Sequence, residues 1–198
     1  LGMPKPFRGE GDPPTFAVAA VRTGFLEAAP HIRASESGVG LRVELLGREI
    51  VFPTVLSEFD WAAAPHGPLV AYHLHEQAYL RHVDVAPDRR AEIILDWINR
   101  HPTGVGWDPH PISLRLLSWG KMLLTQGALP EDAALRANMA RSMPDPAETI
   151  SRGLEVRPQA NHLLSNLVGV VWVGPLLDGE EAEGRRARLV LLACGSDD

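Results

Sequence analysis

Residues 107–121 read Trp-Asp-Pro-His-Pro-Ile-Ser-Leu-Arg-Leu-Leu-Ser-Trp-Gly-Lys, a proline-rich turn that runs into a helical pattern. Asp108 and His110 each precede a proline, which biases both residues away from the α region, whereas Pro111 suits the first turn of a helix. From there, apolar residues recur at helical spacing, at Ile112, Leu116, Trp119 and Leu123. The pattern predicts a buried helix over residues 111–126 with polar and aromatic side chains clustered at its entrance.

Arg115 is a charged residue in this mostly apolar helix and is a candidate for a functional role. It lies four residues before Trp119, close enough for its guanidinium group to stack on the indole. In a mostly buried helix it is either a satisfied core arginine or a group presented to an anionic ligand. The pattern alone favours the core arginine.

The composition narrows the class of protein. The chain has 198 residues, of which 45% are apolar and 22% charged, enough for one domain with a real core. The net charge of −6 argues against bulk nucleic-acid binding, although a local basic patch for an acidic sugar is compatible with it. Cys194 is the single cysteine, which excludes an intramolecular disulfide and a multi-cysteine zinc site.

Targeting signals are not visible in the sequence. No apolar run reaches the roughly 18 residues that a membrane-spanning helix needs. The first residues, Leu-Gly-Met-Pro-Lys-Pro, lack the apolar region of a signal peptide. The sequence therefore predicts no membrane span and leaves the compartment open between cytoplasm and periplasm.

The segments before residue 67 carry little helical signal. Residues 1–14 are rich in proline and glycine and predict a disordered arm. Residues 15–66 predict an irregular segment with a β-hairpin, because apolar residues alternate over residues 41–52 around Gly47-Arg48.

Residues 67–198 predict a helical domain. Helical periods occur over residues 69–82, 88–100, 111–126 and 130–142, and short loops separate them. Helices of this length in sequence suggest antiparallel helical hairpins, so the predicted fold class is mostly α.

Two further stretches place polar side chains beside apolar ones. Tyr72 and His75 share one face of the predicted helix, either as sugar-stacking and acid–base groups or as a face packed on a neighbour. Asn161 and His162 precede an apolar segment that is either a buried helix or a buried strand. Asn161 either donates a hydrogen bond to a ligand or is itself the N-cap of a helix. His162 either has a functional role or is a buried histidine whose hydrogen bonds are made within the protein. Position alone favours packing in each case, and the sequence predicts no metal site.

Three blocks, taken in order, resemble the N-terminal helical part of the heparinase II/III-like family, polysaccharide lyases built on an incomplete (α/α) toroid. Residues 72–75, Tyr-His-Leu-His, are similar to the family's Tyr-Asn-Leu-His. Residues 106–121 are similar to its Gly-Trp-Asp-Pro-Tyr-Pro…Ser-Leu-Arg…Asn-Trp-Ile-Lys. Residues 154–166, Leu-Glu followed by Asn-His-Leu-Leu-Ser-Asn, are similar to its Leu-Glu…Asn-His-Leu-Leu…Asn. The resemblance extends over about residues 69–188.

The resemblance implies a reaction and a set of site residues. Such lyases cleave uronate-containing polysaccharides by β-elimination, in which a donor stabilises the charge that develops on the carboxylate. The resemblance assigns that role to Asn161, with His162 beside it as a further catalytic residue. It assigns the lining of the substrate cleft to six residues, Tyr72, His75, Trp107, Asp108, Arg115 and Trp119. It implies an acidic polysaccharide as partner and no cofactor.

The departures from the family pattern imply a fragment. The family's basic tyrosine and its C-terminal β-sandwich would follow residue 198, so residues 67–198 are expected to form a truncated toroid without lyase activity. Such a toroid exposes apolar surface and is expected to self-associate. The alternative is a helical-hairpin module that binds proteins and has no catalytic role.

Overall fold

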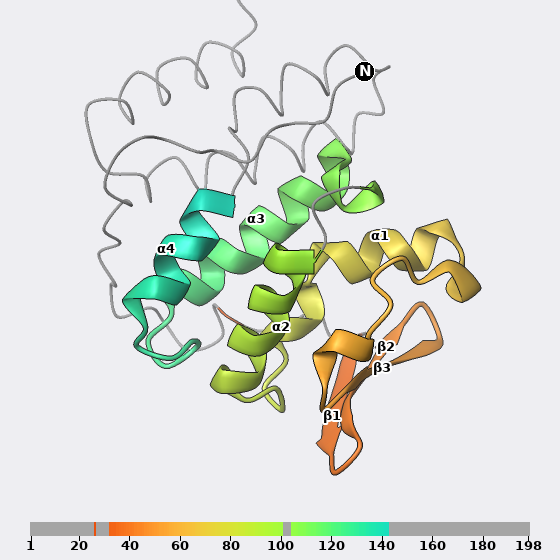
Figure 1. Ribbon diagram of the computed structural model, residues 1–198, viewed down its shortest axis with the longest axis horizontal. Helices are drawn as coiled ribbons and strands as arrows, with labels where there is room; N and C mark the ends of the chain where they lie inside the picture. Colours follow the sequence, from red (N-terminus) through yellow and green to blue (C-terminus); the bar gives the residue numbers. More distant parts are fainter. Residues whose placement is uncertain (1–25, 27–31, 101–103, 143–198) are drawn as a thin grey trace, which may run out of the picture.

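The computed structural model describes residues 26, 32–100 and 104–142, and here three strands precede four α-helices (Figure 1). The strands are β1 (Arg33–Ser37), β2 (Gly40–Leu45) and β3 (Arg48–Pro53). The α-helices are α1 (Pro68–Glu76), α2 (Pro87–Arg100), α3 (Pro109–Leu124) and α4 (Ala133–Ser142). Four 3-10 turns connect them: η1 (Leu56–Glu58), η2 (Ala64–His66), η3 (Ala78–Arg81) and η4 (Val105–Trp107). The described part is therefore a combination of helices and a sheet, where the sequence predicted a mostly α fold.

The three strands form an antiparallel sheet in the order β1-β2-β3. The predicted hairpin is confirmed as β2 and β3, which are joined by Leu46 and Gly47 at φ values of 53° and 73°. Gly40 is required at the start of β2, because its φ is 126° and a Cβ there would overlap the Phe52 carbonyl oxygen. The sequence analysis missed β1, whose residues Arg-Ala-Ser-Glu-Ser carry no apolar alternation.

The helix predicted over residues 69–82 is broken. Helix α1 ends at Glu76, because Gln77 adopts a left-handed conformation at φ 54°, and η3 follows. The Trp119 indole nitrogen donates a hydrogen bond to Gln77 Oε1 at 2.7 Å, and this tertiary contact holds the break. Tyr79 consequently lies in η3, outside the helix that carries Tyr72 and His75.

The other three described helices agree with their predictions to within a few residues. Helix α2 buries Ile94 and Trp97 on one face, and α4 buries Leu135 and Met139. Helix α4 starts at Ala133 because the Asp132 carboxylate accepts the backbone N–H groups of the next turn. Helix α3 starts at Pro109, two residues before the predicted start.

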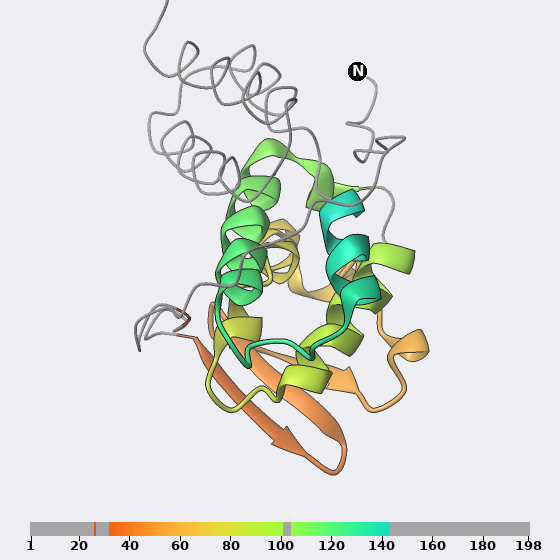
Figure 2. The same cartoon turned by 90° about the vertical axis from the view of Figure 1, so that its left-hand side faces the viewer.

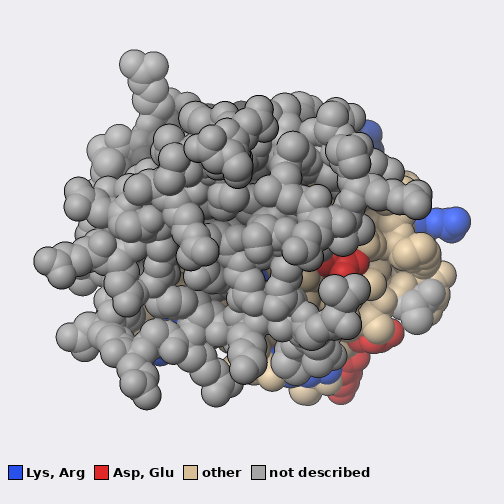
Figure 3. Space-filling model, turned by 90° about the horizontal axis from the view of Figure 1, so that it is seen from above, with Lys and Arg blue, Asp and Glu red and all other residues tan. Residues whose placement is uncertain are grey.

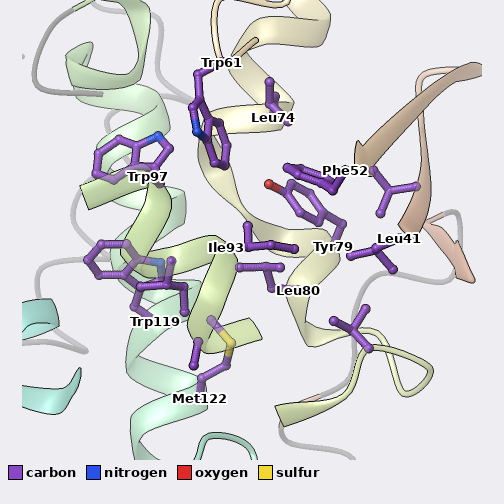
Figure 4. Close-up of a cluster of buried hydrophobic side chains, with 14 of the residues drawn as sticks. Leu41, Phe52, Trp61, Leu74, Tyr79, Leu80, Ile93, Trp97, Trp119 and Met122 are labelled. Carbon is purple, nitrogen blue, oxygen red and sulfur yellow. The ribbon is translucent and has the colours of Figure 1, made fainter. Parts of the chain in front are cut away.

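In the described part of the chain, a hydrophobic cluster joins the sheet to the helices (Figure 4). The Phe52 ring of β3 stacks on Phe59 at 4.3 Å and on Tyr79 at 5.3 Å between ring centroids. Beyond Tyr79 the cluster continues through Ile93 of α2 to Met122 of α3. The sheet and the helices therefore bury their apolar faces against each other.

The principal backbone neighbours among the described α-helices are alternate ones (Figure 2). Helix α1 packs against α3, and α2 packs against α4. When helical hairpins stack, equivalent helices of successive hairpins meet in this way. None of the helices that the structure describes combines the length and the apolar composition that crossing a bilayer requires.

Candidate functional site

The entrance of α3 brings the candidate residues together. Asp108 is extended at φ −69° and ψ 149°, as expected before a proline, and its backbone carbonyl accepts the first helical hydrogen bond from Ile112. The Asp108 side chain does not cap its own helix. It instead accepts a short hydrogen bond from the Tyr72 hydroxyl, which connects the entrance of α3 to the exposed side of α1.

Arg115 lies at the centre of this region and is only 2% exposed. Its Nη1 donates to the His75 carbonyl at 3.1 Å and to the Gly106 carbonyl at 2.8 Å, which joins α1, η4 and α3. Its Cζ lies 4.0 Å from the centroid of Trp97 and 5.4 Å from that of Trp107. Within the described residues Arg115 makes no ion pair with a carboxylate, and its Nη2 has no hydrogen-bond partner. Among the described residues, the guanidinium charge is therefore balanced by carbonyl dipoles and indole faces.

Burial lowers the pKa of Arg115 to about 9. Removal from water disfavours the charged guanidinium, and none of the carboxylates that the structure describes forms an ion pair that would offset this effect. The pKa still lies above 7, so Arg115 carries its charge at neutral pH. A buried cation without a carboxylate partner is uncommon in a purely structural core.

Tryptophan and histidine side chains fix the surroundings of Arg115. The Trp97 indole nitrogen donates to His75 Nδ1 at 3.0 Å, and the Trp97 ring meets that of Trp119 edge-on at 5.9 Å. His75 is 0% exposed and Trp119 is 1% exposed. These buried residues therefore support Arg115 through a hydrogen bond and ring contacts.

A second layer of polar side chains is partly exposed except for Glu76, and most of it was not predicted from the sequence. Glu76, almost fully buried, lies 2.9 Å from His73 Nδ1 through Oε2 and 3.8 Å from His110 Nε2 through Oε1. The spacing of His73 and Glu76 at i and i+3 on one helix was the available sequence signal. The position of His110 depends on the packing of α3 against α1, which no local pattern reveals.

The Tyr72 hydroxyl in this layer is a proton donor. Its hydrogen bond to Asp108, together with burial and the aspartate charge, raises the pKa of Tyr72 to about 12. Tyr72 therefore stays protonated at neutral pH, and its hydroxyl donates to Asp108. The hydrogen bond to Glu76 raises the pKa of His73, so its charged form is favoured.

The structure brings together six of the eight predicted site residues. Tyr72 and Asp108 are bonded to each other in the partly exposed layer, while His75, Trp107, Arg115 and Trp119 form the buried support beneath. Asn161 and His162 lie outside the described residues. Within residues 32–100 and 104–142, no group of three or more histidine, cysteine or acidic side chains could hold a metal ion.

In the view from above, the few described residues that are visible include both acidic and basic side chains (Figure 3).

Comparisons with known proteins give no support for or against a family. No family model, no curated protein and no solved structure matches this chain.

Proposed function

We propose that this chain is the N-terminal helical part of a heparinase-like polysaccharide lyase, which cleaves uronate-containing polysaccharide by β-elimination. One observation carries the proposal: two sequence blocks, residues 72–75 and 106–121, meet through Arg115. Its guanidinium group joins the last turn of α1 to the loop before α3. Tyr72 and Asp108, one from each block, bond to each other above it.

In the proposed site, buried residues position the others, and partly exposed residues contact the sugar. Arg115, His75 and Trp119 act as positioning residues, because they are buried and fixed by hydrogen bonds. Tyr72 and Asp108 contact the sugar, since a tyrosine ring can stack on it and a carboxylate can accept its hydroxyl protons.

In the proposed reaction, the C5 proton next to the uronate carboxylate is removed. The proton is weakly acidic, so a donor must stabilise the charge that develops on the carboxylate. The family resemblance gives this role to Asn161, and removing such a donor lowers the rate by about two to three orders of magnitude. Tyr72 is not the base, because its pKa of about 12 keeps it protonated. In this proposal the base is therefore a residue other than Tyr72.

The helix arrangement supports the toroid in outline. Alternate packing of α1 on α3 and of α2 on α4 is the pattern that successive helical hairpins produce in a curved stack. The sheet formed by β1, β2 and β3 is an addition to this pattern at the N-terminal side of the helices.

A saccharide-binding experiment tests the proposal. The purified chain is titrated by calorimetry with a uronate hexasaccharide and with a neutral hexasaccharide of the same length. The proposal expects weak binding of the uronate only, lost in Asn161→Ala and reduced in Tyr72→Phe, while the control Glu131→Gln binds as the wild type does. Equal binding of both saccharides, or none of either, contradicts it. Formation of unsaturated uronate by the chain alone would show that the base lies within these residues.

A helical-hairpin protein-interaction module without catalysis is the second candidate. The observation that favours it is the burial of His75 and Trp119. Side chains buried to this degree are typical of a structural core that contacts no ligand. It expects no saccharide binding by the wild type and no effect of Asn161→Ala beyond a change in stability.

A further inference from the structure

Among the residues that the structure describes, no strand pairs with the outer edge of β3. The two-residue turn Leu46-Gly47 makes Leu45 and Arg48 a hydrogen-bonded pair, and such pairs alternate along the ladder. Glu49 and Val51 therefore direct their N–H and C=O groups away from β2. The described residues supply no hydrogen-bond partner on that side. An unpaired edge of this kind is a template for another extended segment.

A groove of about 450 Å³ runs beside this edge. Residues from both faces of β3 line it, Ile50 from the core face and Val51 from the other, which places the groove along the strand edge. Its apolar base includes Phe59 and Ala63, and the opposite wall belongs to the chain from η1 to η2. The loop that follows β3 in Figure 1 is this wall.

The opposite wall is held in place by α2. Arg100 donates to the Leu56 carbonyl at 2.6 Å and to the Phe59 carbonyl at 3.1 Å. The Trp61 indole nitrogen donates to Asp96 at 2.7 Å. A groove whose walls are already fixed binds a segment without first having to order its own residues.

The charge of the groove is one-sided. Glu49, Glu58 and Asp60 line it, whereas no lysine or arginine does and His66 is the only other ionisable residue. Arg42 approaches Glu49 only at 4.0 Å, with both side chains well exposed, so it neutralises little of this charge. The complement of this rim is a segment that carries lysine or arginine.

We propose that the outer edge of β3 binds an extended basic segment of a partner protein, which adds to the sheet as a fourth strand. Backbone groups of Glu49 and Val51 pair with the segment, and its apolar side chains enter the groove over Ile50 and Phe59. Its lysine and arginine side chains meet the acidic rim formed by Glu49, Glu58 and Asp60. This inference does not depend on the proposed lyase function, because the edge of β3 contains none of the lyase site residues.

The decisive variant changes one backbone group. Val51→Pro removes the outward N–H without removing a bond to β2, whereas the matched control Val51→Thr keeps it. The probes are a labelled eight-residue peptide of alternating lysine and valine and the same peptide with glutamate for lysine, each added to the full chain. Affinity is read by fluorescence anisotropy, and the oligomeric state of the chain by analytical ultracentrifugation.

The proposal expects the basic peptide to bind, with affinity reduced at least tenfold in Val51→Pro and unchanged in Val51→Thr. Amide hydrogen exchange should slow at Glu49 and Val51 when the peptide is added. The double variant Glu58→Gln/Asp60→Asn should weaken binding, most strongly at low salt, while Glu131→Gln should not.

Three outcomes overturn the proposal. The first is equal binding by the wild type and by Val51→Pro, provided that thermal unfolding shows the variant to be folded. The second is absence of basic-peptide binding, or equal binding of the acidic peptide. The third is a dimer of the chain that Val51→Pro dissociates, which would assign the edge to a second copy of this chain.

Discussion

At the residue scale, Arg115 is the side chain on which the candidate site depends most. Its fork of N–H groups satisfies two buried carbonyls from different elements and lies between indole rings. A lysine offers a single point charge at that position, and a smaller side chain leaves the carbonyls without donors. Stability and site geometry therefore depend on the same guanidinium group.

We expect Arg115→Ala to lower the free energy of unfolding by about 3–5 kcal/mol, because it leaves two buried carbonyls unpaired and creates a cavity. Arg115→Lys should lose less, since its ammonium can still donate to one of them. Urea denaturation followed by tryptophan fluorescence measures both. Arg141→Ala, an exposed arginine on α4, serves as the control and should change stability by less than about 0.5 kcal/mol. A comparable loss in Arg115→Ala and Arg141→Ala would contradict the assignment.

His73 should make stability depend on pH. Its folded pKa is raised above the usual value by the hydrogen bond to Glu76, so the pair stabilises the folded state fully below about pH 6.5. That contribution disappears as the pH rises through the folded pKa. His73→Gln should therefore destabilise the protein more at about pH 5.5 than at about pH 9, as measured by denaturation at both values. In a Glu76→Gln background, where His110 remains, the pH dependence of the His73→Gln effect should largely vanish.

At the element scale, the end of α1 shows a tertiary contact overriding a local pattern. The apolar period continues past residue 76, yet Gln77 turns left-handed so that its amide can reach Trp119. The two residues are 42 positions apart, so no window of sequence could reveal the break. Helix α1 therefore ends where Gln77 accepts a hydrogen bond from the Trp119 indole of α3.

Two substitutions at Gln77 separate the backbone effect from the hydrogen bond. Gln77→Ala should destabilise by about 1–3 kcal/mol, because the buried Trp119 N–H loses its acceptor. Gln77→Gly loses the same bond but adopts a left-handed φ without strain, so it should be about 1 kcal/mol less destabilising. Thermal unfolding of both variants gives the difference. Gln77→Gly being the less stable of the two would show that the left-handed backbone conformation is not strained.

The turn of the hairpin between β2 and β3 can be stabilised by a substitution at Leu46. Leu46 is 52% exposed and occupies a positive φ of 53°, which a leucine rarely adopts. Leu46→Asn should create the Asn-Gly pair preferred by this turn and stabilise the protein by about 0.5–1 kcal/mol, measured by denaturation. The control Val39→Asn, at a second exposed apolar position, should give no gain.

At the scale of the whole molecule, the shared core predicts a shared transition. Phe52 of the sheet packs on Phe59 and Tyr79, so Phe52→Ala should destabilise by about 3–5 kcal/mol. Native-state hydrogen exchange should give the amides of β2 and α2 similar opening free energies, lowered equally by the substitution. If only the β2 amides respond, the sheet unfolds independently of the helices.

Local sequence patterns were sufficient to predict the elements whose buried residues recur at regular helical or strand spacing. Regular apolar spacing located α2, α3 and α4 to within a few residues, and alternation around Gly47 located the hairpin of β2 and β3. Strand β1 was missed because it is bound through backbone pairing to β2 and buries only Ala34. The grouping of Tyr72 with Asp108 was expected, whereas the Glu76–His110 contact arises only when α1 packs on α3.

The bridge from Arg115 to the His75 carbonyl also sets an order of events during translation, because it connects positions 40 residues apart. A ribosome that adds 5–20 residues per second needs about 2–8 s to supply Arg115 after His75 has been made. Trp97 is made 18 residues before Arg115, so for about 1–4 s of that interval the chain contains Trp97 without the guanidinium group that will cover it. Until Arg115 folds onto it, this indole adds to the uncovered apolar surface of the growing chain, the kind of feature that chaperones recognise.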